Sequence, residues 1–141
     1  MNKTELAIEL FTGGFNCATS VLLSFCEEYG LEPETAAKLA CGLGGGCVVG
    51  EICGAASGAV LVIGLKHGQS TYDDLAAKTD CYEKTKQLTE SFAERNGYLT
   101  CRELLEHNNV AEKTPEIAPL KKAFCTGVVK NAVEILEQLG Y

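Results

Sequence analysis

A run of small residues near the middle of the chain restricts the possible folds more than any other feature. It extends from Cys53 to Gly58, with the sequence Cys-Gly-Ala-Ala-Ser-Gly, and it begins a strongly apolar segment that continues to Leu65. Small residues allow other backbones to approach closely, so main chain would enclose the Cys53 sulfur. Because the segment Ile52 to Lys66 is apolar on nearly every helical face, we expect a central helix enclosed by other helices.

The signals that start and stop secondary structure are almost all helical. Capping residues or helix-starting prolines precede each stretch with helical apolar spacing. They are Asn2, Asn16, Pro33, Thr71, Thr100 and Pro119. Strand signals are nearly absent, because the pair Val48-Val49 is too short to count. We therefore expect an all-α fold: a single compact helical bundle, with one domain over residues 1–141.

Two helix boundaries follow from local signals. The helix capped by Asn16 is expected to continue until Gly30 ends it. Thr71 with Asp74 forms a capping box for a long helix that ends at Asn96.

Composition limits the classes of partner. The 141-residue chain has 12 Lys and Arg against 19 Asp and Glu, a net charge of −7. Its densest basic block is the pair Lys121-Lys122, so nucleic acid and anionic membranes are poor partners. No signal peptide is visible in Met1 to Leu10, and the stretch Ile52 to Leu65 is shorter than the roughly 20 residues that span a bilayer. We expect a cytoplasmic protein.

Eight cysteines are unusual in such a chain. Their density is below the roughly 8–10% of disulfide scaffolds, and a reducing compartment favours free thiols, metal ligands or a redox pair. Cys-x2-Cys, Cys-x4-Cys and Cys-x2-Cys-His motifs are missing, which excludes zinc-finger, thioredoxin, ferredoxin and c-type haem sites. His67 and His107 stand alone near expected helix ends, where we expect surface roles.

Three cysteines occupy expected helix starts. Cys17 and Cys101 each follow a capping residue, and Cys53 falls in the first turn if the central helix starts near Gly50 to Ile52. Free backbone N–H groups and the positive end of the helix dipole favour thiolate over thiol, which improves a cysteine as nucleophile and as metal ligand. Cys125 lies inside the last helix on its core-facing side, one turn from two lysines.

The other cysteines carry weaker signals. Three are expected to be small apolar fillers of the core: Cys26, Cys41 and Cys81. Cys47 lies six residues before Cys53 in a glycine-rich turn, and a role as resolving cysteine or ligand stays open. The glycine run Gly42 to Gly46 lacks the features of nucleotide-binding loops, since no strand precedes it and Glu51 stands where a phosphate site needs lysine. It could instead donate backbone N–H groups to sulfur.

Four elements along the chain together resemble those of a known family. They are Phe15 to Ala18, Gly44 to Gly46 followed by Cys53 to Gly58, Cys101 to Leu105, and Cys125 in a C-terminal helix. In order and spacing they are similar to the C_GCAxxG_C_C family of redox-active proteins, over essentially the whole chain. The resemblance implies that the family's four cysteines are Cys17, Cys53, Cys101 and Cys125. The family also resembles the iron–sulfur part of split-Soret-type cytochromes, which implies a [2Fe–2S] cluster on these four cysteines.

Four interpretations stay open. The first is electron transfer or redox sensing by such a cluster, with an unknown redox partner protein. The second is a thiol–disulfide oxidoreductase or peroxide-reactive protein, with Cys53 as nucleophile and another of the four cysteines resolving. The third is a soft-metal binder for Zn²⁺ or Cu(I), and the fourth is a structural helical protein with buried cysteines. The small residues from Gly54 to Gly58 would also let two central helices pack in a homodimer.

Overall fold

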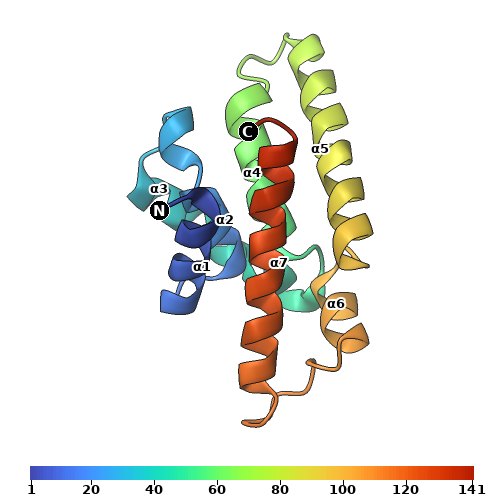
Figure 1. The fold of residues 1–141 in the computed structure, drawn as a ribbon. Coiled ribbons are helices and arrows are strands. Elements are labelled where there is room, and N and C mark those ends of the chain that lie inside the picture. The colour runs from blue at the N-terminus through green and yellow to red at the C-terminus, as the bar shows by residue number, and fades with distance from the viewer.

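The computed structural model describes all residues from Met1 to Tyr141, and its regular elements are helices throughout (Figure 1). The α-helices are α1 (Lys3–Gly13), α2 (Cys17–Leu23), α3 (Pro33–Ala40), α4 (Gly54–His67), α5 (Leu75–Asn96), α6 (Cys101–His107) and α7 (Ala118–Gln138). Short helical turns occur at η1 (Cys26–Tyr29), η2 (Cys41–Leu43) and η3 (Gly46–Gly50). The all-α expectation is confirmed.

Side-chain caps start several of these helices as the sequence predicts. Asn2 and Glu5 form a capping box at α1, and the side chains of Asn16 and Thr100 accept backbone N–H groups of the first turns of α2 and α6. Each such cap is typically worth about 1 kcal/mol of stability. Local side-chain caps therefore fix the starts of α2 and α6, which carry Cys17 and Cys101. The start of α4 has no side-chain cap.

Two expected boundaries are wrong. Helix α2 ends at Leu23 instead of continuing to Gly30, and a short 3₁₀ turn follows. The hydroxyls of Ser20 and Ser24 each donate to the carbonyl oxygen four residues earlier, a contact that weakens a helix. Helix α5 is capped by Asp74 rather than Thr71, because Asp74 Oδ1 accepts the N–H of the third helical residue.

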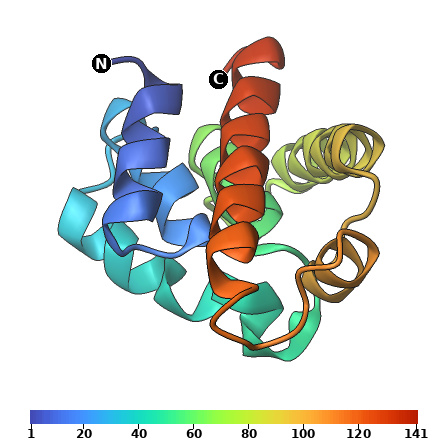
Figure 2. The ribbon, with the colours of Figure 1, turned by 60° about the horizontal axis from the view of Figure 1, so that its bottom comes forward.

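Helix α4 lies at the centre of the molecule. It packs against α2, α5 and α7, and Figures 1 and 2 show α7 crossing in front of it, between α1 and α5. Its fully buried side chains are small or branched: Ala55, Ala56, Ala59, Val62 and Ile63. This confirms the enclosed central helix that the apolar segment predicts.

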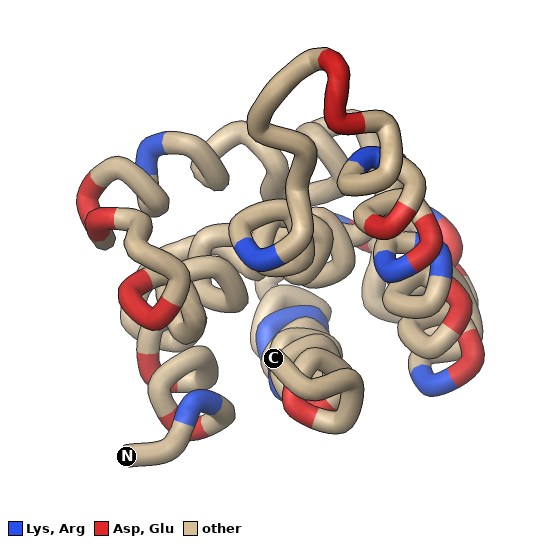
Figure 3. Tube along the Cα trace, turned by 90° about the horizontal axis from the view of Figure 1, so that it is seen from above, with Lys and Arg blue, Asp and Glu red and all other residues tan.

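No Asp, Glu, Lys or Arg residue is buried. Figure 3 shows acidic and basic residues interspersed along the outer helices, without an extended basic stretch. None of the helices combines the length and the hydropathy that crossing a membrane requires.

Candidate functional site

Four thiols from four separate segments line one cavity of about 430 Å³. Cys17 is the first residue of α2, Cys53 precedes α4, Cys101 is the first residue of α6, and Cys125 lies in α7. The remaining wall is mostly apolar and comes from α1, α6 and α7, from the segment Gly14 to Asn16, and from Gly45 and Gly54. The structure therefore brings together the same four cysteines that the family resemblance indicates.

Two glycines of α4 explain why Cys17 and Cys53 are neighbours. A Cβ on Gly58 would stand 2.5 Å from the carbonyl oxygen of Ala18, and a Cβ on Gly54 would collide with the Cys17 sulfur. Side chains larger than hydrogen would therefore push α2 and α4 apart. The small-residue run is what allows the first turns of these two helices to meet.

Helix α4 begins at Gly54, later than the sequence predicts, so Cys53 is its capping position and not part of its first turn. The preceding segment is extended instead of helical. The N–H of Cys53 donates to the Leu99 carbonyl at 2.9 Å, and the N–H of Cys101 donates to the Glu51 carbonyl at 2.7 Å. This short antiparallel pairing joins the two segments that carry Cys53 and Cys101.

The sequence pattern does not predict this pairing. At its centre Ile52 and Thr100 form the structure's isolated β-bridge. Both are β-branched residues directly before a cysteine, which is the one local signal for extended backbone at these positions. A single pair of residues is too short for period-two alternation to reveal it.

The glycine-rich turn closes over Cys17. Gly45 and Gly46 have φ angles of +63° and +64°, a conformation that glycine adopts without a steric penalty. A Cβ on Gly44 would stand 2.6 Å from the Asn16 side-chain nitrogen, which donates to the Cys41 carbonyl at 2.8 Å. The turn thus packs on the residue that caps α2, and the Gly45 backbone N–H is one of the groups that lower the pKa of Cys17.

Cys17 and Cys53 share one proton unequally. A hydrogen bond from the Cys53 thiol is the largest influence on Cys17 and lowers its pKa from the usual 9.0 to about 6, helped by the backbone N–H groups of Gly45 and Ala18 and opposed by burial. The pKa of Cys53 is raised well above 9.0, first because its proton is donated to Cys17 and second because it is buried. Within the pair the thiolate is therefore favoured at Cys17 and the thiol at Cys53.

Cys101 and Cys125 are protonated at neutral pH. Burial is the largest cause that raises the pKa of each, and the negative charge of Cys17 adds to it. For Cys125 the result is a pKa of about 11. The charge of Lys121 acts in the opposite direction on both thiols.

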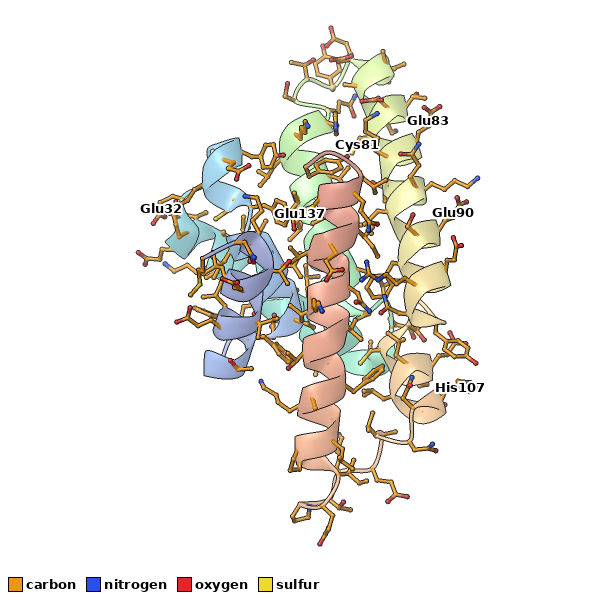
Figure 4. All side chains as sticks on the ribbon, viewed as in Figure 1. Glu32, Cys81, Glu83, Glu90, His107 and Glu137 are labelled. Atoms are coloured by element: carbon orange, nitrogen blue, oxygen red, sulfur yellow. The ribbon has the colours of Figure 1, made fainter.

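The other four cysteines lie outside this cavity. Cys26 is fully buried in the core, as expected, and Cys81 is half-buried on α5 and packs against the core (Figure 4). The expectation that Cys41 is a buried filler is wrong, because it lies in the exposed 3₁₀ turn after α3. Cys47 is also exposed, at a φ of 56° in the glycine-rich turn.

The two histidines are also remote from the four thiols. His107 is exposed on α6 and stacks on Tyr98 with ring centroids 4.3 Å apart (Figure 4). His67 lies at the end of α4, with Nδ1 3.5 Å from an Asp80 oxygen. Neither lines the cavity.

The four sulfurs surround a space and do not converge on one point. No group of three or more His, Cys, Asp or Glu side chains is arranged closely enough to hold a single metal ion. A tetrahedral zinc site needs its ligands around one centre, whereas a two-iron cluster distributes four thiolates over two metal ions. The arrangement can also support chemistry between the Cys17 thiolate and the Cys53 thiol.

Comparison with known proteins gives one family. The family model described as "Putative redox-active protein (C_GCAxxG_C_C)" matches residues 15–139. No curated protein and no solved structure matches the chain.

Proposed function

Because the chain belongs to the C_GCAxxG_C_C family of putative redox-active proteins, we propose that its four cavity cysteines hold a [2Fe–2S] cluster for electron transfer or redox sensing. The observation that carries this proposal is the convergence of Cys17, Cys53, Cys101 and Cys125 on one cavity, while the other four cysteines lie outside it. Four thiolates are the standard ligand set of such a cluster.

The four thiols are close enough to shift one another's pKa. A hydrogen bond couples Cys17 with Cys53, and negative charge on Cys17 raises the pKa of Cys101 and of Cys125 across the same cavity. A cluster requires all four as thiolates, so its binding would release the protons that Cys53, Cys101 and Cys125 hold. When bound, the cluster would supply one-electron redox chemistry.

The surroundings of the thiols fit a redox centre. The side chains of Phe11, Leu104, Phe124 and Val128 line the same cavity. An apolar wall limits the access of water, which influences the reduction potential of an iron–sulfur centre. The Gly45 backbone N–H lowers the pKa of Cys17, and backbone N–H groups that favour a thiolate also tune the potential of an iron–sulfur centre.

Anaerobic reconstitution with iron and sulfide tests this proposal. Wild-type protein should become brown, with charge-transfer bands in the visible region and two irons and two acid-labile sulfides per chain. The Cys53→Ser variant should bind less iron and lose these bands. Colourless wild-type protein without iron would contradict the proposal.

A second function is favoured by the contact between Cys17 and Cys53, in which one sulfur accepts a hydrogen bond from the other. In this alternative the Cys17 thiolate attacks a small disulfide R–S–S–R, forms a mixed disulfide and releases R–S⁻. The Cys53 sulfur then displaces the second R–S⁻ and loses its proton to solvent. The two thiols are oxidised to a disulfide and R–S–S–R is reduced by two electrons, with Cys17 rather than Cys53 as the first nucleophile.

Mass spectrometry after mild oxidation tests this alternative. Metal-free protein treated with a small disulfide should contain a Cys17–Cys53 bridge that dithiothreitol reverses. Oxidation confined to the exposed Cys41 and Cys47 would exclude it.

A further inference from the structure

The thiol cavity has a charge opposite to that of the whole protein. The chain carries 19 acidic and 12 basic residues, yet no carboxylate lines the cavity, and the positive charges of Lys121 and Lys122 outnumber the one negative charge that the Cys17 thiolate contributes. Both lysines are exposed and follow one another in the first turns of α7. Their charges therefore act at the boundary between the cavity and solvent.

Neither lysine is neutralised by an ion pair. Lys122 Nζ donates to the Phe11 carbonyl at 2.8 Å and lies over the Phe11 ring, 3.8 Å from its centroid. The Lys121 side chain makes no hydrogen bond or ion pair, and its charge acts on the cavity thiols. By contrast, Lys130 further along α7 pairs with Glu134 at 3.7 Å. The positive potential of the first two is therefore available to a ligand.

The size and lining of the cavity indicate the size and polarity of the part of a ligand that does not contact the lysines. A volume of about 430 Å³ lies within the range of roughly 300–1,000 Å³ that small-molecule sites occupy. Eleven of the 17 lining residues are hydrophobic, so the body of a ligand would meet apolar side chains and sulfur, and only one side would meet positive charge.

We propose that the cavity binds a small anion whose carboxylate or other oxyanion lies at Lys121 and Lys122 and whose apolar or sulfur-bearing body lies against the thiols. This inference goes beyond the cluster proposal, because it concerns which small molecules reach the metal-free thiols. Cavities lined by charge of one sign concentrate ligands of the opposite sign and accelerate their arrival.

Two alkylating agents of similar size and different charge test the proposal on the full chain. Iodoacetate is an anion and iodoacetamide is neutral, and with both the cysteine thiolate forms an S–C bond while iodide leaves. The ratio of the two rates at one cysteine is independent of its thiolate fraction, because both reagents need the thiolate. Mass spectrometry of reduced, metal-free protein gives this ratio for each cysteine. The exposed Cys41 and Cys47, which lie outside the cavity, provide the internal reference.

We expect the iodoacetate-to-iodoacetamide ratio at the cavity cysteines to exceed that at Cys41 and Cys47 by roughly tenfold, the lower end of the range for charge-lined clefts. The double variant Lys121→Gln/Lys122→Gln should reduce the ratio to the reference value. Lys121→Arg/Lys122→Arg should keep it, and added salt should lower it in the wild type. Lys130→Gln, which removes one positive charge elsewhere on α7, is the matched control and should change nothing.

A cavity ratio equal to the reference, or one that the Gln double variant leaves unchanged while circular dichroism shows an intact fold, would overturn the proposal. The measurement needs no iron. Failure of cluster reconstitution and failure of anion selection are therefore separate results.

Discussion

Gly58 packs so closely on Ala18 that a Cβ added to it would stand 2.5 Å from the Ala18 carbonyl oxygen. This contact joins the small-residue run of α4 to the first turn of α2, and one turn earlier Gly54 meets the Cys17 sulfur in the same way. The spacing of the two glycines thus explains the close approach of Cys53 and Cys17, the pair on which the chemistry of the cavity depends.

Gly58→Ala should destabilise the protein by about 1–3 kcal/mol, because the added methyl group has to displace backbone. Gly64→Ala in the same helix is the matched control. A Cβ there would meet nothing within 4 Å, so alanine should stabilise the helix by up to about 1 kcal/mol. Urea unfolding of both variants measures the difference. Equal effects of the two substitutions would show that close packing is not the role of Gly58.

The hydrogen bond from Cys53 to Cys17 should determine the reactivity of Cys17. Its alkylation rate should follow a titration with a midpoint near pH 6, as expected for a pKa of about 6. Cys53→Ala removes the donor and should move the midpoint upward, whereas Cys53→Ser keeps an O–H donor and should retain more of the effect. Rates measured by peptide mass spectrometry over a pH series test this. A midpoint that is the same in all three proteins would refute the assignment.

Stability of the reduced, metal-free protein should increase as the pH rises from about 6 to about 9. Across this interval folded Cys17 has lost its proton, because its pKa is lowered from 9.0 to about 6, while the unfolded chain still holds it. The unfolded state then binds more protons, so the free energy of unfolding rises with pH. The contribution of Cys17 is lost as the pH falls through 6.

Above pH 9 the sign reverses. Cys125, with a pKa raised to about 11, keeps its proton in the fold after the unfolded chain has released it. Urea unfolding of wild type, Cys17→Ser and the exposed-site control Cys41→Ser measures both trends. The rise between pH 6 and pH 9 should be smaller in Cys17→Ser and unchanged in Cys41→Ser, and an unchanged rise in Cys17→Ser would contradict the thiolate assignment.

Much of the fold could be predicted because its helices start at local signals. Asn2, Asn16 and Thr100 cap helices as their sequence context indicates, and the uniformly apolar segment forms the enclosed central helix. The end of α2 could not be predicted, because it depends on hydrogen bonds from the Ser20 and Ser24 hydroxyls to backbone carbonyls. The sequence pattern does not specify these bonds.

Which cysteines share the cavity could be predicted, whereas the distribution of their protons could not. The family resemblance indicates the four cysteines that line the cavity, but local spacing places Cys53 inside a helix. The pairing of Cys53 with Leu99 and of Cys101 with Glu51 joins segments far apart in the chain. That tertiary arrangement determines which sulfur of the Cys17–Cys53 pair holds the proton. A sequence pattern therefore does not predict it.

Iron and sulfide analysis of two matched sets of variants tests the central claim most directly. The cavity set replaces Cys17, Cys53, Cys101 or Cys125 singly by serine. The outer set replaces Cys26 by alanine and Cys41, Cys47 or Cys81 by serine. After anaerobic reconstitution we predict that every outer variant keeps two irons and two sulfides per chain with the visible bands of the wild type, and that every cavity variant loses iron and those bands. Loss of iron from the outer variants instead of the cavity variants would contradict the account, and so would a reconstituted wild type without iron.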